Sequence, residues 1–210
     1  MSEFPEIIPI FPLYGTILLP NTILPLHIFE PRYQQMIEYT MKHDQVIGIV
    51  QPIEQEQEKI YKIGCLGKIE QCQKLPNENY LIRLNGVLRF QIEKELEVTT
   101  QYRKVASDYS SFVNDLEEGD QDLEDPELLY EKFCNYAEKK NIQIEWEKLR
   151  TIPIHYLVNI LCMNLDFNSM EKQALLETRN LQHRWDTLIT LISMAIADNS
   201  DQLSASECVN

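Results

Sequence analysis

The sequence lacks long apolar runs and has few basic residues. No apolar run approaches the roughly 18 residues that a membrane-spanning helix requires, so we expect no membrane partner. Lys and Arg number 19 against 33 Asp and Glu, which gives a formal net charge of −14. Because nucleic-acid binding is driven largely by Lys and Arg that displace counterions from phosphates, this balance argues against a nucleic-acid partner. The N-terminus carries no basic region of the kind that begins a signal peptide, and we expect a cytoplasmic protein.

Cysteine is also sparse, and its spacing fits neither a metal site nor a disulfide framework. No C-x-x-C pair occurs among the five cysteines, which are Cys65, Cys72, Cys134, Cys162 and Cys208. An odd number of scattered cysteines indicates reduced, mostly buried thiols. The histidines are scattered too, without an H-E-x-x-H motif, and they are His27, His43, His155 and His183. We therefore expect no metal ion and no cofactor.

Motifs for nucleotide hydrolysis and for nucleophilic catalysis are absent. A phosphate-cradling loop requires G-x-x-x-x-G-K-[ST], and the one Gly-Lys step, Gly67-Lys68, lacks the upstream glycine and the following hydroxyl residue. No G-x-S-x-G nucleophile elbow occurs. These absences predict a protein that binds other molecules and is not an enzyme.

Residues 1–110 are rich in short strand patterns bounded by turn residues. Strands are expected at 7–11, 46–51, 60–75, 80–84, 87–92 and 102–109, with a strand–helix unit at 24–41. Asn85-Gly86 is a dipeptide favoured in tight hairpin turns, so we expect a hairpin at that point. Several short strands with one early helix predict a small, mostly antiparallel β-barrel.

Residues 111–127 change character, because they contain eight acidic residues and no Lys or Arg. Like charges repel and little apolar area is available for burial, so we expect a solvated acidic linker. The alternative is an acidic metal-binding loop, but the spacing does not fit the calcium-loop pattern.

Helical patterns follow in residues 128–197. Asp125 and Pro126 suit the start of a first helix, and residues 168–171 (Asn-Ser-Met-Glu) suit a capping box for a later one. Helices joined by short loops predict an antiparallel bundle. Residues 198–210 are expected to form a disordered polar tail. The overall fold class expected is α+β, a β-barrel followed by an α-helical bundle.

The strand–helix unit carries a group of polar residues at its corner. Glu30 and Arg32 are charges placed among large apolar groups, so we expect a structural ion pair or backbone clamp, with an acid–base pair as the alternative. His27 lies in an apolar strand, where a core histidine is expected and a catalytic histidine is the alternative. Tyr33 begins the apolar face of the helix. We interpret these four residues as a structural corner.

The same region resembles the opening of the LON N-terminal (substrate-binding) domain of ATP-dependent Lon proteases. The resemblance rests on residues 11–13 (Phe-Pro-Leu), 19–20 (Leu-Pro) and 25–33 (Pro-Leu-His-Ile-Phe-Glu-Pro-Arg-Tyr). It continues through residues 63–69 and 86–92 and through a Glu-Lys-Gln…Leu-Leu-Glu segment at 171–177. It implies a PUA-like β pseudobarrel for residues 1–110. The sequence lacks the ATPase loop and the Ser–Lys peptidase pair of a full Lon protease.

The resemblance implies a non-catalytic LON substrate-binding-domain protein, one that can carry a peptidase name by association. We expect it to recognise exposed or unfolded polypeptide segments as an adaptor in protein quality control, with a protease or another protein as a further partner. The expected binding residues are large apolar groups in and beside the first loop, namely Leu18, Leu19, Pro20, Ile23 and Leu24. Alternatively, these residues plug the end of the barrel. A different function, small-molecule or RNA binding in the PUA-like groove, also stays open.

Overall fold

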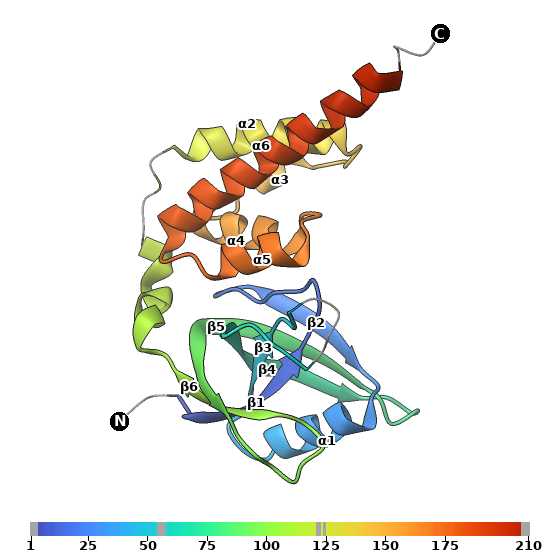
Figure 1. Ribbon diagram of the computed structural model, residues 1–210, viewed down its shortest axis with the longest axis vertical. Helices are drawn as coiled ribbons and strands as arrows, with labels where there is room; N and C mark the ends of the chain where they lie inside the picture. The colour runs from blue at the N-terminus through green and yellow to red at the C-terminus, as the bar shows by residue number, and fades with distance from the viewer. Residues whose placement is uncertain (1–3, 54–57, 121–122, 124, 207–210) are drawn as a thin grey trace.

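A computed structural model describes residues 4–53, 58–120, 123 and 125–206 (Figure 1). Its strands are β1 (Ile7–Pro12), β2 (Ile23–Ile28), β3 (Val46–Val50), β4 (Ile63–Lys74), β5 (Tyr80–Glu95) and β6 (Lys104–Asp108). They form one sheet in the order β2-β5-β4-β3-β1-β6, and a further β5–β6 pairing closes the sheet on itself. β1 and β3 are parallel, and the other pairs are antiparallel.

The strands form where the sequence alternates between apolar and polar residues or is apolar throughout. Every residue of β3 is buried, as expected for the apolar run Val-Ile-Gly-Ile-Val in the middle of a sheet. β5 shows alternation: Ile82 and Leu84 are buried, while Leu81 and Arg83 face solvent. The first half of β5 pairs with β2, and its second half pairs with β6.

The hairpin turn predicted at Asn85-Gly86 is wrong, because both residues lie inside the long strand β5. Gly86 does not have the positive φ that a tight hairpin turn of this type needs. Its glycine identity has another cause: a Cβ at this position would lie 2.0 Å from the carbonyl oxygen of Leu19. Gly86 therefore permits the first loop to approach the strand backbone closely.

The helices confirm an α+β fold. α1 (Pro31–Thr40) follows β2, and the 3₁₀ helix η1 (Ser110–Asp120) follows the sheet. The remaining helices, stacked on one side of the barrel in Figure 1, are α2 (Pro126–Lys139), α3 (Trp146–Leu149), α4 (Ile154–Asn164), α5 (Ser169–Leu176) and α6 (Leu181–Ser206). Asp125 caps α2, and Asn168 with Glu171 forms a complete capping box on α5. No helix in the described ranges is long and apolar enough to cross a membrane.

Two further sequence predictions need correction. Residues 111–127 were expected to be solvated, but residues 110–120 form η1, and Asp115 is only 2% exposed. A disordered tail was expected from residue 198, but α6 continues to Ser206; residues 207–210 lie outside the described residues. The division into barrel, linker and helical parts at residues 110 and 128 stays a prediction.

The barrel and the helices share one hydrophobic core. This core joins Leu18 and Leu19 from the first loop to residues of the helices, among them Leu157 and Trp185. A second, smaller core fills the barrel around Ile8, Leu88 and Phe90. The first loop therefore lies between the barrel and the helices. This position determines whether the loop is free to bind a ligand.

Candidate functional site

The first loop is not an exposed apolar surface, so this part of the sequence prediction is wrong. Leu18 and Leu19 are fully buried, and Pro20 is buried as well. The loop is held on two sides: the Asn159 side chain on α4 donates to the Pro20 carbonyl at 3.0 Å, and the Thr22 hydroxyl donates to the Leu19 carbonyl at 2.6 Å. The helical part covers the loop, which corresponds to the alternative of a plug at the barrel end.

The other two residues of the expected binding set begin β2. Ile23 and Leu24 are each partly buried. Because side chains alternate along a strand, they lie on opposite faces of the sheet, and Leu24 packs against the main core. The five residues therefore do not form one continuous binding patch.

The structural corner brings three of its four residues together. The guanidinium of Arg32 donates to the carboxylate of Glu30, with Nε–Oε2 and Nη2–Oε2 distances of 2.9 and 2.8 Å. The same guanidinium lies 4.6 Å from the centre of the Tyr33 ring. Burial raises the pKa of the Tyr33 phenol above its ordinary value. The Glu30–Arg32 pair is two-fifths exposed and lies beside the buried Tyr33; its role as a structural corner stays a prediction.

His27 is exposed on the outer face of the sheet, so the expectation of a core histidine is wrong. The Asn79 side-chain amide lies 3.1 Å from its Nε2. The structure records no ion pair or hydrogen bond between His27 and Glu30 or Arg32 in the described chain. Within those same ranges, no three His, Cys, Asp or Glu side chains converge as metal ligands would.

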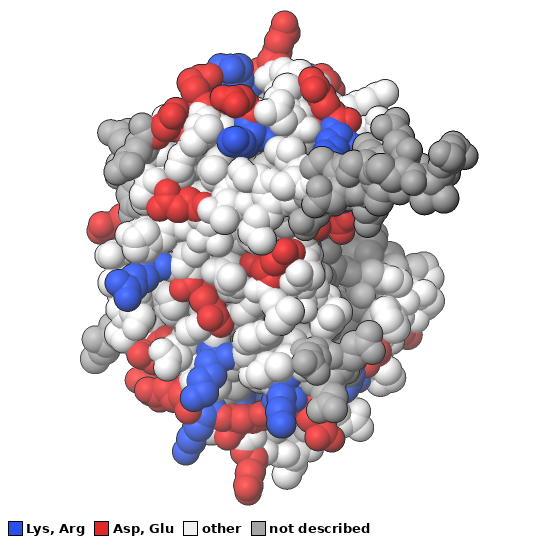
Figure 2. Space-filling model, turned by 45° about the horizontal axis from the view of Figure 1, so that its top comes forward, with Lys and Arg blue, Asp and Glu red and all other residues white. Residues whose placement is uncertain are grey.

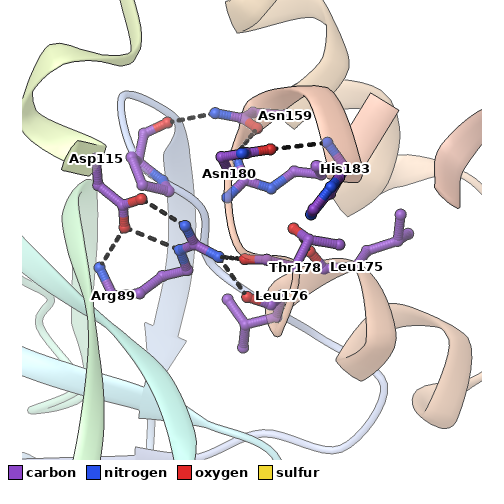
Figure 3. A network of polar contacts seen from close by, with 10 residues as sticks. Arg89, Asp115, Asn159, Leu175, Leu176, Thr178, Asn180 and His183 are labelled. Atoms are coloured by element: carbon purple, nitrogen blue, oxygen red, sulfur yellow. Dashed lines mark hydrogen bonds and ion pairs between the residues drawn. The ribbon is translucent and has the colours of Figure 1, made fainter. Parts of the chain in front are cut away.

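Sequence reasoning missed a buried polar network centred on Arg89 of β5 (Figure 3). The guanidinium of Arg89 is paired with the carboxylate of Asp115 on η1, with Nη2–Oδ1 and Nε–Oδ2 distances of 2.6 and 2.9 Å. It also donates to the carbonyls of Leu176 and Thr178, at the end of α5. Both charged side chains are at most 2% exposed. One guanidinium thus joins the barrel, η1 and the helical part.

A second buried contact links two helices to the first loop through Asn159, which is labelled in Figure 3. Arg184 on α6 donates to the side-chain oxygen of Asn159 at 2.8 Å, and Asn159 in turn donates to the Pro20 carbonyl. Arg89 and Arg184 are the two largest fully buried side chains in the described residues. The local sequence signal for Arg89 is its position between two apolar residues, Leu88 and Phe90; Arg184 follows a histidine and carries no such signal. Both arrangements connect the helices to the barrel.

An open sheet face and edge remain as the surface that could hold an extended ligand. β2 ends the sheet order and pairs only with β5 in the part of the chain that is described. An open groove of about 460 Å³ crosses β2, β5 and β4. The groove is lined by Pro25, Leu26, His27, Gln71, Gln73, Leu81, Ile82 and Arg83. On the face shown in Figure 2, basic side chains are interspersed with acidic ones.

The chain belongs to the family of ATP-dependent protease La (LON) substrate-binding domains, whose family model matches residues 7–194. Among curated proteins it is similar to the Lon protease of Anaeromyxobacter dehalogenans and to Lon protease 2 of Myxococcus xanthus. Each is 27% identical over 200 residues, an alignment that covers 91% of this chain and 24% of the relative. The chain therefore spans about a quarter of the length of these relatives.

Solved structures agree on the fold. The Lon N-terminal domain protein from Xanthomonas campestris superposes with a TM-score of 0.63 at 18% identity, covering 88% of this chain and 97% of that one. The N-terminal domain of the Mycobacterium avium complex Lon protease gives a TM-score of 0.61 at 16% identity, covering 89% and 98%. The α+β architecture is thus shared over nearly the whole of both neighbours.

Proposed function

We propose that this protein recognises exposed or unfolded polypeptide segments and serves as an adaptor in protein quality control. The observation that carries the proposal is the match of residues 7–194 to a substrate-binding domain of a protease family. The substrates of a protease are polypeptides, and a domain that selects them without cutting them needs a surface that accepts extended chains. The open edge and face of the β2–β5–β4 sheet are such a surface.

The proposal includes no catalysis within the 210 residues. The sequence carries no nucleotide-binding loop, and the two buried arginines, Arg89 and Arg184, make structural contacts between the barrel and the helices. Binding alone is therefore the expected activity, in a cytoplasmic setting with a protease or another protein as the second partner.

The test is binding of an unfolded protein compared with its folded form. A fluorescently labelled protein, held unfolded by reduction and alkylation of its disulfides, is titrated with this chain and followed by fluorescence anisotropy. Saturable binding of the unfolded form, with at least tenfold weaker binding of the folded form, supports the proposal. Equal binding of both forms, or of neither, would remove it. A parallel assay for peptide cleavage, with and without ATP, should show no hydrolysis.

A further inference from the structure

The outer edge of β2 presents backbone groups that can pair with another strand. The Gly86 amide donates to the Thr22 carbonyl at 2.8 Å, and the register then runs from Ile23 opposite Asn85 to Ile28 opposite Tyr80. Antiparallel strands direct the backbone groups of alternate residues toward the partner strand. The backbone groups of Leu24, Leu26 and Ile28 therefore face β5, and those of Ile23, Pro25 and His27 face outward.

Proline at position 25 fits this geometry. Pro25 has no N–H, and its nitrogen lies on the outward side, where no ladder bond to β5 is lost. The edge thus offers two N–H donors, at Ile23 and His27, and three carbonyl acceptors. Proline on an edge strand limits uncontrolled pairing with other chains. An incoming strand can still bond on both sides of Pro25, but with one bond fewer, which favours reversible binding.

The sheet face beside this edge is apolar and locally basic. Cross-strand neighbours form two rows: Pro25, Arg83 and Gln71, and then His27, Leu81 and Gln73. Leu81 is 43% exposed. Among the described residues that line the groove, Arg83 and His27 are ionisable and none is acidic, although the whole chain carries a net charge of −14. This local reversal of charge favours an acidic ligand.

We propose that an extended polypeptide segment pairs with the outer edge of β2 and that the segment alternates apolar and acidic side chains. The proposal rests on the proposed function and names its site and its substrate class. Backbone pairing supplies affinity, and side chains on the groove face supply preference. Arg83 lies one strand further in, so an acidic side chain on the added strand is about 10 Å from the Arg83 backbone. The attraction is therefore moderate and weakens with salt.

The experiment uses three labelled eight-residue peptides and the full chain. One peptide alternates valine and glutamate, the second alternates valine and lysine, and the third is the first with a central proline. Fluorescence anisotropy at low salt is expected to show binding of the Val–Glu peptide, at least fivefold weaker binding of the Val–Lys peptide and loss of binding with the proline. Amide hydrogen exchange at Ile23 and His27 should slow when the Val–Glu peptide binds.

Two variants test the site itself. Pro25→Val restores the missing outward N–H and is expected to tighten binding of the Val–Glu peptide by about two- to tenfold, the effect of one hydrogen bond. Arg83→Glu should reverse the preference between the acidic and basic peptides. Lys148→Glu makes the same charge change on the exposed helix α3 and should leave that preference unchanged. Unchanged thermal unfolding temperatures ensure that all three variants are folded.

Different failures are distinguishable. If the unfolded protein binds but Pro25→Val and Arg83→Glu change nothing, the β2 edge is not the site, while the proposed function stands. If neither the unfolded protein nor any peptide binds, both proposals fall. If the wild-type chain sediments as a dimer that Pro25→Val tightens while no peptide binds, the occupant of the edge is a second copy, and the peptide proposal is overturned.

Discussion

The buried pair of Arg89 and Asp115 should contribute more to the stability of the protein than any exposed ion pair, because it joins the barrel to the helices. Asp115→Asn keeps the shape of the side chain but removes its charge, so the buried guanidinium of Arg89 loses its ion pair with that carboxylate. The wild-type pair is at most 2% exposed, and three hydrogen bonds join Arg89 to the carboxylate, two from the guanidinium and one from the backbone N–H. Removing one partner of a pair so buried typically costs about 3–5 kcal/mol, against total stabilities of about 5–15 kcal/mol.

Replacing both charges should not restore stability. A buried ion pair can often be exchanged for apolar residues without loss, because the desolvation of both charges is relieved. Here, however, Arg89 also donates to the carbonyls of Leu176 and Thr178. The double variant Arg89→Met/Asp115→Leu leaves these two carbonyls unpaired, at about 1–3 kcal/mol each. We therefore expect the double variant to remain about 2–6 kcal/mol less stable than the wild type.

Urea denaturation followed by circular dichroism measures these differences as changes in the free energy of unfolding. The exposed pair of Arg150 and Glu127 serves as a matched control, since Glu127→Gln there should cost much less than Asp115→Asn because solvent screens the two charges. A loss of less than about 1 kcal/mol for Asp115→Asn would show that the pair behaves as a surface contact. A double variant with the wild-type free energy of unfolding would show that the hydrogen bonds to the two carbonyls contribute nothing to stability. Either result would refute the reasoning.

Three further predictions concern the first loop, the glycines and the corner. Leu19→Ala should lower the free energy of unfolding by about 2–5 kcal/mol in urea denaturation, because the side chain is fully buried; a loss under about 1 kcal/mol would contradict the plug. Gly86→Ala should cost about 3 kcal/mol or more by clashing with the Leu19 carbonyl, whereas Gly15→Ala, in open space with a φ of +66°, should cost only about 1–2 kcal/mol. Since burial raises the pKa of Tyr33, the folded state keeps that proton longer than the unfolded state above pH 10.0, so stability falls as pH rises past that value. Tyr33→Phe should make the decline between pH 9 and 11 shallower, and an unchanged slope would count against it.

Local signals in the sequence predicted the features that depend on neighbouring residues. The caps at Asp125 and Asn168 were correct because a cap requires only a side-chain acceptor and the next turn of the helix. The strands around β3 and β4 followed from apolar runs and alternation. The α+β class could be predicted for the same reason, and the family resemblance agreed with it.

Contacts between distant segments could not be predicted in this way. Asn85-Gly86 has the composition of a hairpin turn, but its glycine serves the approach of Leu19, which is more than sixty residues away in sequence. Asp115 lies in a strongly acidic segment, and only its pairing with Arg89 distinguishes it from its solvated neighbours. Composition averages over such residues, so it assigns the whole segment to solvent.

The apolar loop and the open edge of β2 differ in how well the local sequence predicts them. The exposure of the loop cannot be predicted from neighbouring residues, whereas the free strand edge can. Whether Leu18 and Leu19 face solvent depends on helices that lie more than a hundred residues further along the chain, so no local pattern decides it. A free edge on β2 can be recognised from the local sequence. A proline in mid-strand is compatible with the sheet only where its nitrogen faces away from a neighbouring strand. Pro25 carries that information in the sequence, next to the very residues that were expected to bind. We therefore place the proposed polypeptide surface on the strand that follows the loop, and we propose that backbone pairing at its edge, supported by Arg83, takes the place of contact with an apolar loop.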